Sequence, residues 1–243
     1  MVLLLLLLLL LLPALAALYL VYRPPPQLIQ YLQHRWPDIL WQVPTSAKVI
    51  ALTIDDGPSI YTREILDILK ANNATATFFI IGSHVCGRED VLRDIISNGN
   101  ELGNHAMHDE PSFKLSDCEL ESQIHAVEQM IHNAYKNVTG PEAESFPKYF
   151  RPGSGFVTAR MRKLLHQLGY SLVLGGIDPH DPQIPFACVN SAHILSMARP
   201  GGIIICHDGR SWSPSMLRAV LPKLRQRGYK IITITELLKS SPP

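Results

Sequence analysis

Charged residues are few in this sequence of 243 residues, and the two signs balance. Lys and Arg together number 22, Asp and Glu number 21, the formal net charge is +1, and the basic residues form no run. A nucleic-acid-binding protein normally shows a basic face or cluster. The sequence also lacks the glycine-rich fingerprint of a dinucleotide-binding fold and a phosphate-binding loop. We therefore expect no nucleic acid among its partners.

Cysteine is equally scarce, with four in the whole chain: Cys86, Cys118, Cys188 and Cys206. An oxidising compartment would permit disulfides, and four cysteines allow three pairings between which the sequence does not choose. Cys206 stands in an apolar run beside His207, so a buried free thiol is as good an interpretation there as a bridge. The sequons Asn73-Ala74-Thr75 and Asn137-Val138-Thr139 are consistent with a lumenal route.

One long apolar run, Val2 to Leu20, opens the chain and contains only leucine from Leu3 to Leu12. At roughly 20 residues it could span a bilayer, whereas Ala14-Leu15-Ala16 is typical of a signal-peptide cleavage site. We predict that residues 1–22 are a signal peptide or a membrane anchor, and the sequence leaves both open. Either one places the remaining domain outside the cell or in a lumen, as a secreted or membrane-anchored protein.

The rest of the chain fits one large domain. Pro24-Pro25-Pro26 forms a stiff spacer, residues 23–47 are a linker or N-terminal arm, and residues 48–240 are the globular domain. Within it, apolar β-branched runs alternate with amphipathic helical patterns. The predicted strands are 49–54, 75–81, 101–104, 149–150, 171–174, 203–206 and 230–235. This alternation predicts parallel βαβ units, in either a doubly wound sheet or a barrel.

In both architectures ligands bind at the carboxyl ends of the strands, and polar residues gather there. Asp55 and Asp56 follow the first strand, and two adjacent carboxylates at a strand end favour a cation as partner. His105 ends the third strand, with His108 and Asp109 shortly after it. A histidine three or four residues from a second ligand, joined by a carboxylate from elsewhere, suits Zn²⁺ or a similar ion.

Three further strand ends carry residues that suit proton transfer. His207 follows the run 203–206, and an imidazole there can act as general acid because its pKa lies near working pH. A buried Arg151 could fix and acidify Asp55, and Asp181 could orient His207. Each of these two could instead belong to an ordinary ion pair. His84 and His180 also lie at strand ends, as candidate substrate contacts.

The order and spacing of these residues resemble the polysaccharide deacetylase family, which is carbohydrate esterase family 4 or the NodB homology domain, over residues 48–238. Five segments resemble its motifs: Thr53-Ile54-Asp55-Asp56-Gly57-Pro58, Asn104-His105, Phe150-Arg151-Pro152-Gly153-Ser154-Gly155, Asp178-Pro179-His180-Asp181 and Ile205-Cys206-His207. The resemblance implies a deformed (β/α)7 barrel whose catalytic domain is residues 48–240. It also implies roles for six residues: Asp55 as general base, Asp56 and His105 as metal ligands, Arg151 holding the base, Asp181 tuning the acid, and His207 as general acid.

The sequence departs from the family pattern in three places. The second metal-binding histidine of the family would stand at position 109, where this chain has Asp109, with His108 as the alternative ligand. An extra carboxylate would shift the preference of the site from Zn²⁺ towards Mn²⁺, Fe²⁺ or Co²⁺. The aromatic residue of the third motif is replaced around Gly153-Ser154, and the tryptophan of the fourth motif is replaced by Pro182. These changes affect the identity of the substrate more than the chemistry.

The resemblance implies a metal-dependent hydrolase that removes N-acetyl or O-acetyl groups from an acetylated polysaccharide, such as chitin or another glycan containing N-acetylglucosamine. A backbone N–H near Gly153 would hold the developing oxyanion. Two alternatives stay open: hydrolysis of another C–N or ester bond on the same scaffold, and a non-catalytic glycan-binding domain. The sequence does not determine the glycan, its chain length, the native metal or the oligomeric state.

Overall fold

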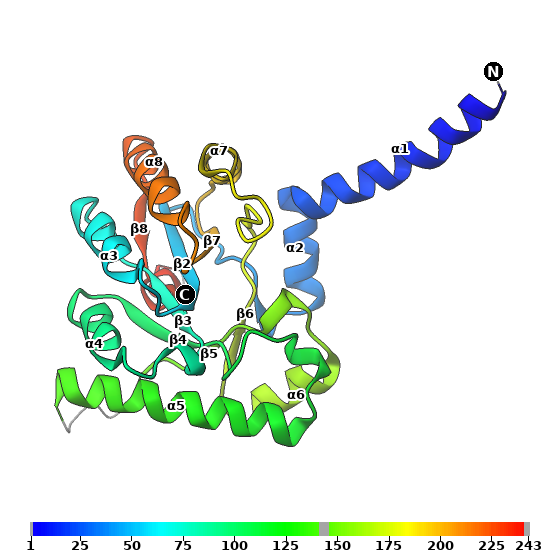
Figure 1. Ribbon diagram of the computed structural model, residues 1–243. Coiled ribbons are helices and arrows are strands. Elements are labelled where there is room, and N and C mark those ends of the chain that lie inside the picture. The colour runs from blue at the N-terminus through cyan, green and yellow to red at the C-terminus, as the bar shows by residue number, and fades with distance from the viewer. Residues whose placement is uncertain (1, 141–145, 241–243) are drawn as a thin grey trace.

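A parallel β-sheet forms the centre of the molecule (Figure 1). The computed structural model describes residues 2–140 and 146–240, with side chains from Leu11 onward. Within this range the strands run in the order β1-β6-β5-β4-β3-β2-β7, and β8 pairs with β2. Their bounds are β1 Ile39–Leu40, β2 Val49–Gly57, β3 Thr77–Ile80, β4 Glu101–Asn104, β5 Tyr149–Phe150, β6 Ser171–Val173, β7 Ile203–His207 and β8 Lys230–Ile232.

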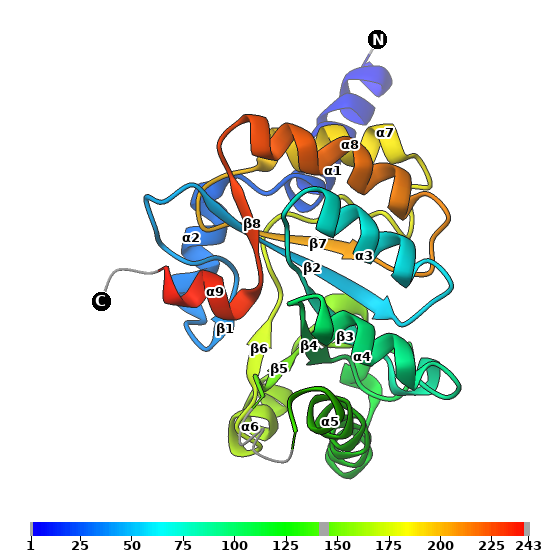
Figure 2. The same cartoon turned by 90° about the vertical axis from the view of Figure 1, so that its left-hand side faces the viewer.

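Helices connect the strands and cover the outside of the sheet (Figure 2). They are α1 Val2–Tyr22, α2 Pro26–Arg35, α3 Thr62–Ala71, α4 Glu89–Ser97, α5 Asp117–Thr139, α6 Ala159–Gln167, α7 Ala187–Met197, α8 Ser213–Gln226 and α9 Ile234–Lys239. A capping box opens α5, since the Ser116 side chain accepts from the Glu119 N–H while the Glu119 carboxylate accepts from the Ser116 N–H. Gly99 and Gly169 follow α4 and α6 with positive φ, as is common where a glycine ends a helix.

The sheet curls into a half-barrel rather than lying flat. β2 pairs with β8 near its start and with β3 near its end, while β7 pairs along its other edge. On the opposite side of the curl, isolated bridges join Ile177 to Ile204 of β7 and Gln42 to Gly202, which precedes β7. This arrangement confirms the parallel α/β architecture and is consistent with a deformed (β/α)7 barrel.

Two apolar layers follow from the alternation of side chains along the strands. On the outer face, Ile50, Leu52 and Ile54 of β2 pack against the helices in the largest core cluster. On the inner face, Ala51 of β2 packs with a smaller cluster that includes residues of β7, β8 and α9. The inner face becomes polar towards the carboxyl end of β2, where Thr53 and Asp55 continue the row that Ala51 begins. The site therefore lies at the open end of the curl.

The N-terminal arm contributes to the sheet. α2 packs beside the curl, and β1 extends it by pairing with β6 through Ile39–Leu172 and Leu40–Val173. α1 projects away from the body of the molecule (Figure 1). In the part of the chain whose side chains are described, no helix is both long and apolar enough to cross a membrane. Much of the predicted signal or anchor, residues 1–10, lies outside that part.

Three strands differ from their predicted bounds by two or more residues at one end. β2 continues to Gly57, so Asp55 and Asp56 belong to the strand itself rather than to the turn after it. β3 is shorter than predicted and spans Thr77–Ile80. β8 ends at Ile232 because the Thr233 side chain accepts a hydrogen bond from the Glu236 N–H and caps α9.

All four cysteines are free, and Cys206 is buried while the other three are exposed.

Candidate active site

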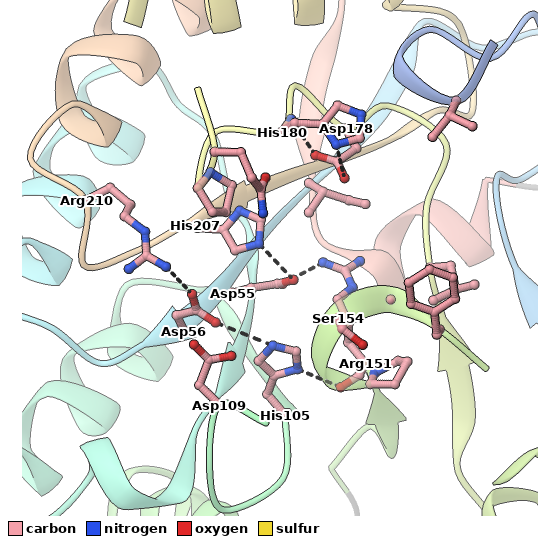
Figure 3. A pocket seen from close by; sticks show the side chains of 18 residues that line it. Asp55, Asp56, His105, Asp109, Arg151, Ser154, Asp178, His180, His207 and Arg210 are labelled. Carbon is pink, nitrogen blue, oxygen red and sulfur yellow. Dashed lines mark hydrogen bonds and ion pairs between the residues drawn. The ribbon is translucent and has the colours of Figure 1, made fainter. Parts of the chain in front are cut away.

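The polar side chains at the carboxyl ends of the strands meet in one cavity of about 550 Å³ (Figure 3). Asp55 of β2 and His207 of β7 are direct register partners in the sheet. His105 follows β4, and Arg151 follows β5. The parallel sheet therefore brings residues up to 152 positions apart into one site, as the sequence predicted.

Arg151 fixes the position of Asp55. Its Nη1 donates to Asp55 Oδ1 at 2.6 Å and to Thr53 Oγ1 at 2.6 Å, while its Nε donates to the Val173 carbonyl at 3.2 Å. Asp55 and Arg151 are both buried, and the guanidinium lies 4.3 Å from the centroid of the Phe79 ring. The fixed guanidinium therefore gives the buried carboxylate one orientation and a partner of opposite charge. The predicted Asp55–Arg151 pair is present.

Asp181 fixes His207 in the same way. Asp181 is fully buried; its Oδ1 accepts from His207 Nδ1 at 2.8 Å and its Oδ2 accepts from the His207 backbone N–H at 3.0 Å. Burial alone would lower the pKa of His207, but the hydrogen bond and charge of Asp181, together with the charge of Asp55, raise this pKa to about 9. His207 is therefore an imidazolium at neutral pH in this state, with its Nε2 N–H available as a donor.

Asp55 and His207 lie side by side in the cavity. Asp55 Oδ2 lies 4.0 Å from His207 Nε2. One group is a proton acceptor, the other is a proton donor, and each is fixed by its own buried partner. A reacting group placed between them could lose a proton to one side and gain one from the other.

Asp56 and His105 form the second half of the site. His105 Nδ1 lies 2.6 Å from the Arg151 carbonyl oxygen, which can only accept, so Nδ1 carries the proton. In a neutral ring Nε2 then points its lone pair at Asp56 Oδ1, 3.5 Å away. Two acceptors so placed require a cation or a proton between them. This donor set fits a divalent ion, and the hydrogen bond to the Arg151 carbonyl orients His105 as in many metal sites.

In the metal-free protein, the surrounding charges and hydrogen bonds favour a proton on His105 and an ionised Asp56. Burial disfavours the charged form of Asp56, yet its hydrogen bond with His105 and the nearby charges of His207 and Arg210 lower the pKa of Asp56 below the ordinary value. Burial likewise disfavours an imidazolium at His105, but the hydrogen bond with Asp56 and the charge of Asp55 raise the His105 pKa above its ordinary value.

The third predicted ligand is placed less tightly than the first two. Asp109 is exposed, lines the cavity and lies below Asp56 in Figure 3. His108 is exposed and is not among the described residues that line it. Across the described residues, no three His, Cys, Asp or Glu side chains lie close enough together to hold a metal ion. The choice of Asp109 over His108 stays a prediction, and ligation by Asp109 would require its loop to close towards Asp56.

Two residues at the site had no signal in the sequence. Arg210 Nη2 lies 3.1 Å from Asp56 Oδ2, so a guanidinium contacts the predicted metal ligand. Trp212 Nε1 donates to the Asp181 carbonyl at 3.0 Å. An aromatic side chain from another loop thus supports Asp181, although Pro182 stands where the fourth motif has its tryptophan.

The expected oxyanion donor near Gly153 is not free at Gly153 itself. The Gly153 N–H donates to Ser112 Oγ at 2.9 Å, and both residues are buried. The expectation of a donor near Gly153 stays a prediction. The sequence did not show that the Gly153 N–H is already paired, because Ser112 lies 41 positions away and its approach depends on tertiary packing. A Cβ at Gly153 would lie 2.2 Å from the Glu110 carbonyl oxygen, so this close contact requires glycine.

Backbone strain concentrates around the cavity. Four of the five non-glycine residues with positive φ in the described chain lie at the cavity or next to a residue that lines it: Asp56 (67°), Ala106 (63°), Ser154 (65°) and His180 (57°). Such conformations cost about 1–3 kcal/mol each and cluster at functional sites. They support the interpretation of this cavity as an active site.

The two histidines proposed as substrate contacts have different surroundings. His180 lines the cavity, and its backbone N–H donates to Asp178 Oδ1 at 2.7 Å. His84 lies 2.8 Å, through Nδ1, from the carbonyl oxygen of Asp56, so it supports the strained backbone there. Asp208 is likewise structural: fully buried, it accepts from the side chains of Ser59 and Thr62 and ties the loop after β7 to the turn after β2.

Sequence comparison agrees with this arrangement. The family model described as polysaccharide deacetylase matches residues 42–173. A peptidoglycan-N-acetylglucosamine deacetylase of Bacillus cereus is 33% identical over 207 residues, which cover 83% of this chain and 93% of that protein. This chain therefore belongs to the polysaccharide deacetylase family.

Other relatives show the range of the family. The peptidoglycan-N-acetylmuramic acid deacetylase PdaC of Bacillus subtilis is 31% identical over 196 residues, and the chain spans 40% of its length. Among solved structures, the Bc1960 peptidoglycan N-acetylglucosamine deacetylase superposes with a TM-score of 0.76 at 26% identity, covering 85% of this chain and 96% of that one. A family pseudoenzyme from Bacillus anthracis superposes with a TM-score of 0.74 at 26% identity, covering 84% and 70%.

Proposed function

We propose that this protein hydrolyses the acetamido group of N-acetylated amino sugars in a polysaccharide, with release of acetate. The observation that carries the proposal is the facing pair Asp55 and His207, 4.0 Å apart, each held by its own buried partner. A domain that only binds glycans has no need of a fixed acceptor and a fixed donor side by side in one cavity. Because family members include a pseudoenzyme, this pair matters more to the proposal than the fold does.

In the proposed mechanism Asp55 accepts a proton from the attacking water, and Arg151 keeps that carboxylate ionised and aimed. His207 donates its Nε2 proton to the leaving amine, while Asp181 holds the ring in the required tautomer. Asp56 and His105 would hold a divalent ion, with Asp109 as third ligand. When bound, such an ion would polarise the amide carbonyl and lower the pKa of water at the site.

The relatives narrow the substrate class. Two of them are named for N-acetylglucosamine or N-acetylmuramic acid in peptidoglycan, and a Bradyrhizobium relative at 26% identity is named a chitooligosaccharide deacetylase. We therefore propose a glycan containing N-acetylglucosamine as substrate, with peptidoglycan and chitin oligomers as the first to test. The leucine-rich N-terminal segment supports action outside the cytoplasm, as a secreted or membrane-anchored enzyme.

Acetate release from N-acetylglucosamine oligomers and from peptidoglycan tests this proposal. The protein is stripped of metal, and single divalent ions (Zn²⁺, Mn²⁺, Fe²⁺ or Co²⁺) are then returned. We expect turnover only with metal, and Asp55→Asn should abolish it while leaving metal binding intact. Asp67→Asn, an exposed aspartate on α3, is the matched control and should behave as the unmodified protein. Unchanged turnover in Asp55→Asn would refute its role as the base.

A further inference from the structure

A second cavity adjoins the catalytic one on the side of the N-terminal arm. It has a volume of about 420 Å³ and lies between α2, the end of α1 and the mouth of the curled sheet. Its outer wall is aliphatic and is supplied by Leu28, Ile29 and Leu32 of α2, with Leu20 from α1. The family match begins at residue 42, so this wall belongs to a segment outside the matched region.

The two cavities are continuous. Seven residues line both, and the apolar ones among them are Val21, Leu174 and Ile205. Along β7, Ile203, Ile204 and Cys206 are buried, whereas Ile205 and His207 are partly exposed. Because side chains two apart on a strand point to the same side, Ile205 lies beside the general acid on the inner face. The catalytic cavity therefore has an apolar floor that runs from His207 towards α2.

We propose that this apolar groove is an acyl-binding subsite, which lets the enzyme remove N-acyl groups longer than acetyl from amino sugars. The inference rests on the proposed function, because it places the carbonyl under attack between Asp55 and His207. Hydrolysis of such an amide consumes one water, breaks the C–N bond, and yields the free amine and a fatty carboxylate. The carbonyl substituent would then extend over Ile205 and Leu174 into the groove.

The dimensions favour a chain longer than acetyl. Two residues along a strand span about 6.6 Å, which is the separation between the backbone positions of Ile205 and His207. The methyl carbon of an acetyl group lies only about 1.5 Å from the carbonyl carbon. An acetyl group attacked at His207 would leave the floor at Ile205 uncovered, whereas an acyl chain of about six carbons spans the distance to Ile205 and points along the groove towards α2.

The chemistry of the wall favours an acyl chain over a sugar. A sugar ring needs partners for its hydroxyl groups, and the α2 face of the groove offers only aliphatic carbon from Leu28, Ile29 and Leu32. Trp41 also lines the groove, but its Nε1 is buried and has no hydrogen-bond partner. The polar residues, Asp178 and His180 among them, lie on the rim shared with the catalytic cavity, where the sugar itself would sit.

Turnover of N-acetyl-, N-butyryl- and N-hexanoylglucosamine oligomers by the metal-loaded protein tests the subsite. We expect kcat/KM to rise by at least about tenfold from acetyl to hexanoyl, since each buried methylene changes affinity by about fourfold. Leu32→Trp should fill the groove and remove this gain while leaving acetyl turnover unchanged. Leu28→Trp gives the same test from a second position. Tyr31→Trp also places a tryptophan on α2, at a side chain that is 62% exposed, and should keep the gain.

The outcomes separate the two proposals. If acetate is released but chain length brings no gain, or the gain survives both groove-filling variants, the subsite is refuted and the deacetylase stands. If no substrate turns over, the proposed function fails, and calorimetric binding of the same three ligands decides the subsite alone. Binding then has to strengthen with chain length and weaken in Leu32→Trp for the subsite to stand, and equal binding of all three overturns it.

Discussion

Arg210 Nη2 lies 3.1 Å from Asp56 Oδ2, on the same carboxylate whose Oδ1 faces His105 Nε2 at 3.5 Å. The guanidinium side chain is 30% exposed and lines the catalytic cavity (Figure 3). One oxygen of the predicted metal ligand is therefore already paired with a fixed positive charge. A divalent ion at Asp56 has to compete with that charge or displace it.

Replacing Arg210 should strengthen metal binding. We expect Arg210→Gln to tighten the binding of Zn²⁺ or Mn²⁺ by about tenfold, because it removes a repelling charge a few ångströms from the ion. Arg210→Lys, which keeps the charge, should change affinity much less. Titration calorimetry of the metal-free protein measures both. Arg218→Gln, in the exposed ion pair between Arg218 of α8 and Glu64 of α3, is the control. Unchanged or weaker binding in Arg210→Gln would mean that Arg210 stabilises the metal-bound state.

Loss of one acceptor at Asp181 should impair the general acid. Both carboxylate oxygens accept from His207, one from the ring and one from the backbone. An asparagine side chain has only one acceptor oxygen, so its NH₂ group would face the second N–H donor of His207. This contact favours the wrong tautomer of the His207 ring. We expect Asp181→Asn to lower kcat by about 10²- to 10⁴-fold with little change in KM. NMR titration of His207 should show its pKa falling from the raised value, and an unchanged pKa with low kcat would assign Asp181 a purely structural role.

The raised pKa of His207 predicts a stability change with pH in the metal-free protein. Asp181 and Asp55 favour the imidazolium in the folded state and so outweigh its burial, which moves the pKa from 6.5 to about 9. A raised folded-state pKa gives stability that is fully present below pH 6.5 and is lost as pH rises to about 9. The loss should amount to at most about 3 kcal/mol. Urea unfolding from pH 6 to pH 9.5 gives the free energy of unfolding of the unmodified protein and of His207→Gln, and the difference between these two values measures the loss. If the difference stays constant over this pH range, the prediction is contradicted.

Residues of the site that belong to strand ends could be predicted from the sequence. Asp55, Asp56, His105 and His207 lie at or directly after buried apolar runs, and a parallel sheet has to bring such ends together. The pairing of Arg151 with Asp55 and of Asp181 with His207 was one of two interpretations of the residues, and the family resemblance favoured it. Both pairs are present, because opposite charges buried in one cavity leave few other arrangements.

Contacts that depend on loops could not be predicted in this way. Arg210 lies three residues after His207 in an irregular segment, where nothing in the local pattern shows the direction of its side chain. Trp212 supports Asp181 from a different loop than the motif would suggest. The arm before residue 48 has weak periodicity, yet it forms a helix, adds β1 to the sheet and builds the wall of the groove. Its conformation depends on packing against the sheet more than on local propensity.

The contact between Gly153 and Glu110 links two of the site loops and gives a further prediction. Gly153 follows Arg151, whereas Glu110 follows the predicted ligand Asp109. A methyl group at position 153 would lie 2.2 Å from the Glu110 carbonyl oxygen, so the Glu110 backbone would have to move. We expect Gly153→Ala to reduce the free energy of unfolding by about 1–3 kcal/mol and to weaken metal binding by displacing Asp109.

Gly155→Ala is the matched control for that variant. Gly155 lies in the same short 3₁₀ turn and has positive φ, but a Cβ there would meet no atom within 4 Å. Any decrease in the free energy of unfolding of Gly155→Ala therefore reports backbone strain alone, and we expect it to be about 1 kcal/mol or more. Chemical denaturation and metal titration of both variants separate the two effects. If Gly153→Ala loses stability but binds metal as tightly as Gly155→Ala does, Asp109 is not a ligand, because its loop would have moved without consequence for the ion.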